Sequence, residues 1–178
     1  MFVTSKAAKD ITPKKAESYI LGYTVGNDLS CRYFQLPNNS GGQFYFAKAF
    51  DKFAPIGPVL VSPKNFNADA STKRLITRVN GKTVQDTVIA DDMIFKPAQI
   101  LSQMSQGLYM FPIKIRSLGA LTPTLTGTTI PAGTAVMTGT PAGVGAFQSP
   151  KSFLGDGDVI EVELSGVGIL RNTIRFEE

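Results

Sequence analysis

The dipeptide Asn80-Gly81 constrains the fold of this chain more than any other feature. It separates residues 75–79 from residues 82–86, and apolar and polar side chains alternate in both runs. Asn-Gly favours a type I′ turn, whose twist matches that of two antiparallel strands. The segment is therefore predicted to form a β-hairpin.

Other parts of the chain carry similar patterns. The turn residues at 155–158 precede a second alternating run, residues 159–164, and residues 55–61 are predicted to form a buried strand. Seventeen glycines and eleven prolines in 178 residues favour many turns over a helical bundle. Short helices are expected near residues 12–20 and 98–104. The predicted fold class is mainly β with a few short helices (α+β), and mostly antiparallel.

Residues 22–35 combine a strand with a polar turn. Aromatic and β-branched side chains end at a Gly-Asn-Asp turn, which places Asp28 at the end of a strand. Arg32 and Gln35 follow at i+4 and i+7, so a helical turn would put the three side chains on one face. This set suits a divalent cation and an anionic, oxygen-rich substrate. An alternative interpretation is that Asp28 caps the next turn and pairs with Arg32.

A lysine lies within the aromatic run at residues 43–53. Phe44 and Phe46 alternate with other residues as they would in a strand, and Lys48 follows in mostly apolar surroundings. A lysine held there is partly desolvated, which favours an anionic partner. An ordinary exposed lysine is the alternative.

Composition excludes several classes of function. The chain has one cysteine, Cys31, and no histidine, so it has no internal disulfide, no Ser-His-Asp triad and no histidine-bound zinc. Its net charge of +4 is mild, and its N-terminal lysines are not interleaved with aromatic residues. No apolar run has the length of a membrane span. We expect a cytoplasmic or mitochondrial protein without nucleic-acid or membrane partners.

Four blocks of sequence, in this order, resemble the catalytic domain of the fumarylacetoacetate hydrolase family. They are residues 22–35, residues 47–58, residues 78–95, and the glycine-rich residues 138–145 together with Gly157-Asp158. The resemblance implies a mixed β-roll, which is usually a homodimer. It also implies Mg²⁺ or Mn²⁺ held by three carboxylates, and substrates that are 2-oxo or 1,3-diketo acids.

The same resemblance assigns roles to single residues. Asp28 resembles one of the metal carboxylates, and Arg32 and Gln35 resemble substrate-binding groups. Lys48 resembles the lysine that binds substrate and stabilises developing oxyanion or enolate charge. Thr140 resembles a catalytic threonine that contacts the substrate carboxylate. These roles agree with general chemistry, because an ammonium group beside an enolate oxygen stabilises its charge.

The chain departs from the family pattern in three places. No Glu-x-Glu pair, which supplies the other two metal carboxylates, precedes Asp28, and no histidine is present to act on an N-terminal lid. Asp91 and Asp92 do not replace that pair by motif. Residues 108–127 interrupt a junction that is short in the family, and they are predicted to be an insertion. We interpret residues 1–178 as a single catalytic-type domain that is partial and truncated at its N-terminus, with weak metal binding by Asp28.

Two functions follow. The first is a metal-dependent hydrolase or lyase that acts on 2-oxo or 1,3-diketo acids, by acylpyruvate hydrolysis or oxaloacetate decarboxylation. The second is a catalytically inactive family remnant that binds a carboxylate ligand or dimerises. A β-rich interaction module is a third interpretation. Substrate choice does not follow from these residues.

Overall fold

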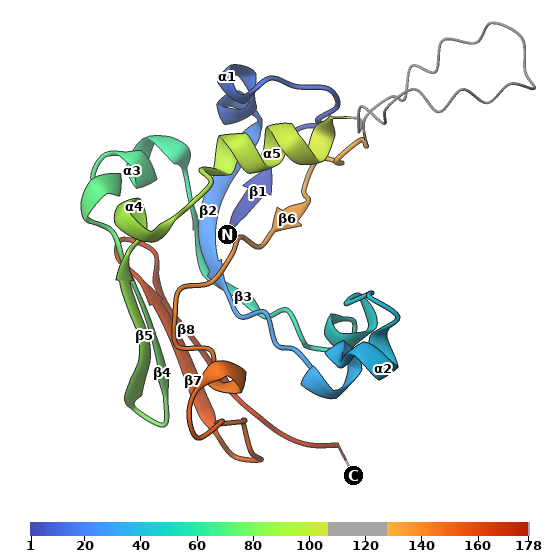
Figure 1. Cartoon of the computed structure of the whole chain (residues 1–178). Helices are drawn as coiled ribbons and strands as arrows, with labels where there is room; N and C mark the ends of the chain where they lie inside the picture. Colours follow the sequence, from blue (N-terminus) through green and yellow to red (C-terminus); the bar gives the residue numbers. More distant parts are fainter. Residues whose placement is uncertain (107–127, 178) are drawn as a thin grey trace, which may run out of the picture. The chain divides into compact units, whose positions relative to one another are not determined.

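The computed structural model describes residues 1–106 and 128–177 (Figure 1). The chain divides into two compact units. The larger unit contains Met1 with residues 22–93 and 137–177, and the smaller unit contains residues 2–21, 94–106 and 128–136. The predicted insertion at 108–127 lies outside the described residues. The interpretation of residues 1–178 as one partial catalytic domain stays a prediction.

The larger unit contains a four-stranded antiparallel sheet (Figure 1). In spatial order its strands are β5 (Lys82–Val88), β4 (Arg74–Val79), β7 (Val159–Leu164) and β8 (Gly168–Thr173). Thr77 of β4 lies opposite Gln85 of β5 on one side and Val162 of β7 on the other. Asn80 and Gly81 have φ values of 51° and 79°, as a type I′ turn requires, so the predicted hairpin is confirmed.

One face of this sheet carries the core of the larger unit. Burial alternates along β7, as the period of a half-buried strand requires. Tyr23 stacks on Phe66, with 4.2 Å between the ring centroids. The buried members of this cluster are Val25, Phe66, Ile160, Val162, Leu164 and Val167.

The strand that leads to the polar turn is β2 (Ile20–Gly26), and it pairs with β3 (Ile56–Val61). Tyr23 lies opposite Val61, and Gly26 lies opposite Ile56. The prediction of a strand at residues 55–61 is confirmed, but the prediction that this strand is buried is wrong. The strand forms, but Ile56, Val59 and Leu60 are about half exposed in this chain.

Residues 27–53, called the site segment below, contain no strand. They form short turns: η2 (Arg32–Gln35), α2 (Pro37–Ser40) and η3 (Phe46–Lys48). The strand expected from Phe44 and Phe46 is therefore wrong. Both rings are more than half exposed, so no buried face selects an extended backbone there.

The remaining short helices of the larger unit are α3 (Pro63–Asn67), η4 (Ala70–Thr72), α4 (Ile89–Asp92) and η5 (Gly145–Phe147). Lys73, which directly follows η4, has a buried side chain that is 3% exposed. Its Nζ lies 2.5 Å from Asp69 Oδ1. Lys73 also lies 4.9 Å from the centroid of the Phe66 ring. The buried ammonium group of Lys73 is thus paired with the carboxylate of Asp69.

In the smaller unit β1 (Phe2–Thr4) pairs with β6 (Ala135–Val136). The helices are α1 (Pro13–Ala16), η1 (Glu17–Tyr19) and α5 (Pro97–Ser105), which confirms the two helical regions expected from sequence. Ser102 Oγ donates to the Ile11 carbonyl at 2.7 Å, and Ser105 Oγ accepts from the Ile11 N–H at 3.3 Å. None of the described helices is long and apolar enough to cross a bilayer.

Candidate substrate site

Asp28 lies two residues beyond the end of β2 and pairs with Lys48. The distance from Lys48 Nζ to Asp28 Oδ2 is 2.5 Å, and the same ammonium donates to Ser30 Oγ at 2.9 Å. The side chains of Lys48 and Asp28 are 37% and 51% exposed, so the pair is open to solvent on one side. Lys48 is therefore partly buried and has an anionic partner, as its surroundings in the sequence indicate.

Backbone hydrogen bonds hold this part of the site segment in place. They join residues 27–31 to residues 47–55, so the loop that carries Asp28 lies against the loop that carries Lys48. The bonds run from Asn27 N to Pro55 O (3.0 Å), Leu29 N to Phe53 O (3.1 Å) and Cys31 N to Ala47 O (2.8 Å). The pair thus depends on main-chain contacts between segments about twenty residues apart.

Arg32 and Gln35 lie at the two ends of η2. Arg32 Nη1 donates to Gln35 Oε1 at 2.7 Å. On its other side the guanidinium lies 5.6 Å from the centroid of the Phe147 ring, within the range of a cation–π contact. The alternative in which Asp28 pairs with Arg32 is wrong, because Asp28 bonds to Lys48 and Arg32 bonds to Gln35.

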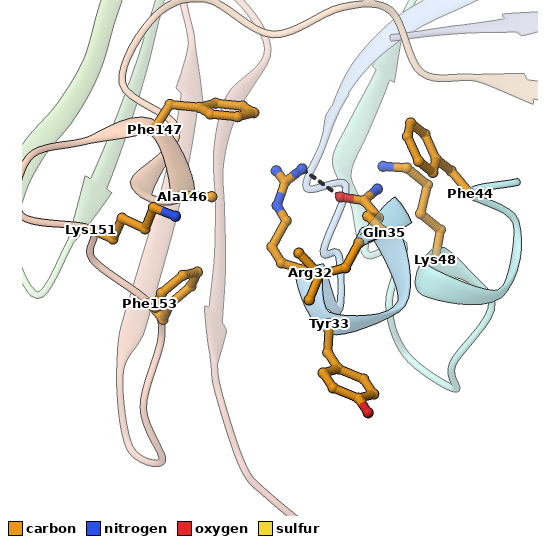
Figure 2. A pocket seen from close by; sticks show the side chains of 10 residues that line it. Arg32, Tyr33, Gln35, Phe44, Lys48, Ala146, Phe147, Lys151 and Phe153 are labelled. Carbon is orange, nitrogen blue, oxygen red and sulfur yellow. Dashed lines mark hydrogen bonds between the residues drawn. The ribbon is translucent and has the colours of Figure 1, made fainter. Parts of the chain in front are cut away.

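These side chains line a cavity of about 610 Å³ within the larger unit. Figure 2 shows Arg32, Gln35 and Lys48 on one side of it and residues 146–153 on the other. The polar lining residues are Arg32, Gln35, Lys48 and Lys151, and the others are Tyr33, Leu36, Phe44, Ala146, Phe147 and Phe153. The cavity combines apolar walls with a few polar groups, as small-molecule sites commonly do.

The charge of the cavity is positive. Arg32, Lys48 and Lys151 line it, and no Asp or Glu is among the described lining residues. Asp28 is not among the lining residues, and its ion pair with Lys48 offsets the charge of that lysine. A carboxylate that enters such a site gains charge-assisted hydrogen bonds in surroundings drier than bulk water.

Thr140 is exposed and is not among the residues that line the cavity. Gln85 of β5 holds its loop: Nε2 donates to Thr140 Oγ1 at 2.8 Å and to the Pro141 carbonyl at 2.9 Å. The hydroxyl oxygen therefore accepts from Gln85, and its proton stays available to another acceptor. The assignment of Thr140 to the substrate stays a prediction.

The same loop approaches β5 closely. A Cβ atom built on Gly143 would lie 1.9 Å from the Val84 carbonyl oxygen, so glycine is needed there. The edge of the four-stranded sheet therefore sets the position of the glycine-rich block at residues 138–145.

The described residues do not by themselves form a magnesium or manganese site. In residues 1–106 and 128–177, no group of three His, Cys, Asp or Glu side chains is placed to hold a metal ion. Asp28 is the one carboxylate that the family resemblance assigns, and Lys48 already occupies its Oδ2. A hydrated Mg²⁺ needs several anionic oxygens to replace its water, and Asp28 supplies too few.

Sequence reasoning missed three residues at this site. Ser30 lies inside residues 22–35, and its spacing of eighteen residues from Lys48 carries no signal of a contact. Phe147 and Lys151 lie between the glycine-rich block and the turn at 155–158, where no periodicity marks a function. Only the fold brings this stretch to face Arg32 (Figure 2).

Comparison with known proteins shows which proteins this chain is similar to. The mitochondrial oxaloacetate tautomerase FAHD2A of Homo sapiens is 33% identical over 172 residues, which cover 97% of this chain and 48% of the relative. A fumarylacetoacetate hydrolase from psychrophilic Exiguobacterium antarcticum superposes with a TM-score of 0.73 at 30% identity, covering 99% of this chain and 54% of that one. A 2-hydroxyhepta-2,4-diene-1,7-dioate isomerase from Mycobacterium marinum gives 0.72 at 30% identity, covering 98% and 55%.

The chain spans about half the length of the relatives it matches. The solved structures share the fold of this chain. In the described residues that fold consists of two antiparallel sheets and a few short helices. The family model for the fumarylacetoacetate (FAA) hydrolase C-terminal region matches residues 1–175. The chain therefore belongs to the fumarylacetoacetate hydrolase family.

Proposed function

We propose that this chain takes part in an enzyme that acts on 2-oxo or 1,3-diketo acids by stabilising an enolate. The observation that carries the proposal is that Arg32, Gln35 and Lys48 line one positively charged cavity. The relatives support it by their names: a tautomerase of oxaloacetate, an isomerase of an enol diacid and a hydrolase. Each of these reactions develops enol or enolate character next to a carbonyl group.

Arg32 is the residue proposed to bind the substrate carboxylate. Its planar guanidinium suits bidentate contact with a carboxylate. The bond to Gln35 Oε1 fixes its orientation and leaves the Gln35 amide N–H groups available to a substrate oxygen.

Lys48 is the residue proposed to stabilise the enolate oxygen. An ammonium group has three N–H donors, and two of them bond to Asp28 and Ser30. The third remains for an oxyanion. Because its two partners already orient the amine, little reorganisation is needed when charge develops. Asp28 and Ser30 thus position Lys48 in this scheme.

The reaction belongs to one of three classes: tautomerisation, hydrolysis of a carbon–carbon bond, or decarboxylation. All three use the same charge stabilisation, so the cavity alone supports their common step. Weak binding of Mg²⁺ or Mn²⁺ at Asp28 stays a prediction, and no step is assigned to a metal here. Thr140 is proposed to contact the carboxylate through its free hydroxyl proton.

A second candidate function is ligand binding without turnover. It is favoured by the single carboxylate at the site, whose Oδ2 is occupied by Lys48, and by the absence of histidine from the sequence. In that case the cavity holds a carboxylate metabolite, and Lys48 binds without catalysing.

The proposal also covers assembly and compartment. A homodimer is supported by the exposed apolar side chains of β3, which a second copy would remove from water. The cytoplasm and the mitochondrion both remain proposals, and the human relative carries "mitochondrial" in its name.

The test compares Lys48→Met with Lys52→Met, a matched control. Lys52 lies in the same segment, and its side chain is 87% exposed. Tautomerisation and decarboxylation of oxaloacetate and hydrolysis of acetylpyruvate are each assayed with and without Mn²⁺. Loss of an oxyanion donor lowers kcat by about 10²–10³-fold, whereas the stability of the fold changes by no more than about 1 kcal/mol.

Each outcome assigns one function. Turnover that Lys48→Met abolishes and Lys52→Met preserves supports the enzyme. Calorimetric binding of these acids without turnover in any assay supports the second candidate. If the folded chain neither binds nor converts them, both are overturned.

A further inference from the structure

The positively charged side chains that line the cavity differ in whether a carboxylate of the described residues pairs with them. Asp28 offsets Lys48. Arg32 bonds to Gln35, whose amide is neutral. Lys151 lines the same cavity and has no hydrogen-bond or ion-pair partner among the described residues. Two positive charges, those of Arg32 and Lys151, thus face the cavity without a carboxylate partner in the described part of the chain.

These two charges lie on opposite walls. Arg32 comes from η2 in the site segment, and Lys151 comes from the stretch after η5 (Figure 2). Phe147 and Phe153 flank Lys151 along that wall. The space between the two cations is therefore bordered by apolar rings, which suit a carbon chain between two acid groups.

The wall that carries Lys151 is fixed by its own hydrogen bonds. Ser152 N donates to the Gly145 carbonyl at 3.0 Å, and Gln148 Nε2 donates to the Gly143 carbonyl at 2.9 Å. A Cβ atom on Gly145 would lie 2.0 Å from the Ser152 carbonyl oxygen, so the turn closes tightly. These contacts place the backbone at Lys151 without help from its side chain.

We propose that Lys151 binds a second carboxylate and thereby makes the cavity selective for dicarboxylic 2-oxo acids. This inference rests on the proposed function, in which Arg32 binds the first carboxylate. A dianion can pair one carboxylate with Arg32 and the other with Lys151. A monoanion of the same length pairs with Arg32 only, and it places a methyl group beside the Lys151 ammonium. Lys151 acts in specificity and takes no part in stabilising the enolate.

The test measures calorimetric binding of 2-oxoglutarate and 2-oxopentanoate. These acids have five carbons each, differ only in the second carboxylate, and do not decarboxylate during the measurement. Because Lys151 is exposed, one ion-pair contact predicts that the unmodified chain binds the diacid about two- to fivefold more tightly. Lys151→Met removes that preference by weakening the binding of 2-oxoglutarate more than that of 2-oxopentanoate, and Lys151→Arg keeps most of it.

Two further variants separate the possible failures. Arg32→Met weakens binding of both acids, and Lys64→Met, at an exposed position outside the cavity, changes neither. If both acids bind through Arg32 but Lys151→Met weakens them equally or not at all, the inference is overturned and the proposed function stands. If neither acid binds the folded chain, the proposed function fails and the inference fails with it.

Discussion

The four-stranded sheet and the site segment are built differently. The sheet consists of paired antiparallel strands, whose register shifts once, between Thr77 and Arg78 in the β4–β5 pair, and one of its faces lies in the core. The site segment consists of short turns, and its aromatic side chains are largely exposed, with Tyr33 at 64% and Tyr45 at 81%. The comparison teaches that the element that stabilises this unit differs from the segment that contributes most of the candidate site.

The aromatic residues of the site segment contact one another. Successive ring centroids are 4.8 Å apart for Phe34 and Phe46, 5.3 Å for Phe46 and Phe50, and 5.1 Å for Phe50 and Phe53. None of these rings belongs to the buried cluster under the sheet. The segment is thus held mainly by its own rings and by main-chain hydrogen bonds, with Leu29 as its contact to the core cluster, which permits local opening at a lower free energy than global unfolding.

The largest expected effect separates the two regions directly. Leu164→Ala removes a side chain that is 3% exposed in the core, and it is expected to lower the free energy of unfolding by about 2–5 kcal/mol. Phe46→Ala removes a ring that is 59% exposed, and its loss costs about 1 kcal/mol. Urea denaturation followed by far-ultraviolet circular dichroism measures both.

Ligand binding should rank the same two variants in the opposite order. Phe46 precedes Lys48 in η3, so its removal disturbs the cavity, whereas folded Leu164→Ala retains the cavity residues. Equal losses of stability from the two substitutions would show that the site segment shares the core of the sheet, and the comparison would then be wrong.

The sheet was predictable from the sequence because its signals are local. The Asn80-Gly81 turn and the alternation along β7 each depend on neighbours within a few residues, and both predictions are confirmed. Phe44 and Phe46 show the same alternation without a buried face, and there the pattern predicted a strand that does not form. Periodicity specifies a strand only where the fold supplies something to bury it against.

The site was less predictable because its contacts are long-range. Arg32 and Gln35 are three residues apart, so their bond follows from a helical turn. Asp28 and Lys48 are twenty residues apart, and only the family resemblance suggested that both belong to one site. Lys151 lies more than one hundred residues from both and carries no motif, so neither spacing nor the resemblance could reveal it.

A smaller effect tests the connection between the two kinds of structure. Gln85→Ala removes both hydrogen bonds from the sheet to the loop of Thr140, and it is expected to lower the free energy of unfolding by about 1–2 kcal/mol. The loop should also become more mobile, which hydrogen exchange of the amides in residues 138–145 would detect. Gln43→Ala, at an exposed position in the site segment, is the matched control.

The variant Gln85→Glu, which introduces a negative charge, sharpens this test. Its carboxylate cannot donate to the Pro141 carbonyl, and the Thr140 hydroxyl would turn to donate to it. If Thr140 contacts the substrate carboxylate, this variant raises KM for an oxo acid more than its change in stability explains. An unchanged KM would argue against the role proposed for Thr140.

The smallest expected effect concerns acid and the turns of the sheet. Asp158 accepts hydrogen bonds from the Gly155 N–H at 2.7 Å and from the Asn80 amide at 2.8 Å, and these bonds lower the pKa of its carboxyl from its ordinary value. Because the folded-state pKa is the lower one, the stabilisation is fully present above the unfolded pKa and is lost as pH falls through the folded value.

Asp158→Asn should therefore lower the urea midpoint at pH 6 and flatten its decline below about pH 4. Asp86, whose pKa the adjacent Arg74 lowers, leaves a residual slope in the variant. Parallel pH curves for the two proteins would mean that Asp158 does not link the β4–β5 turn to β7 energetically.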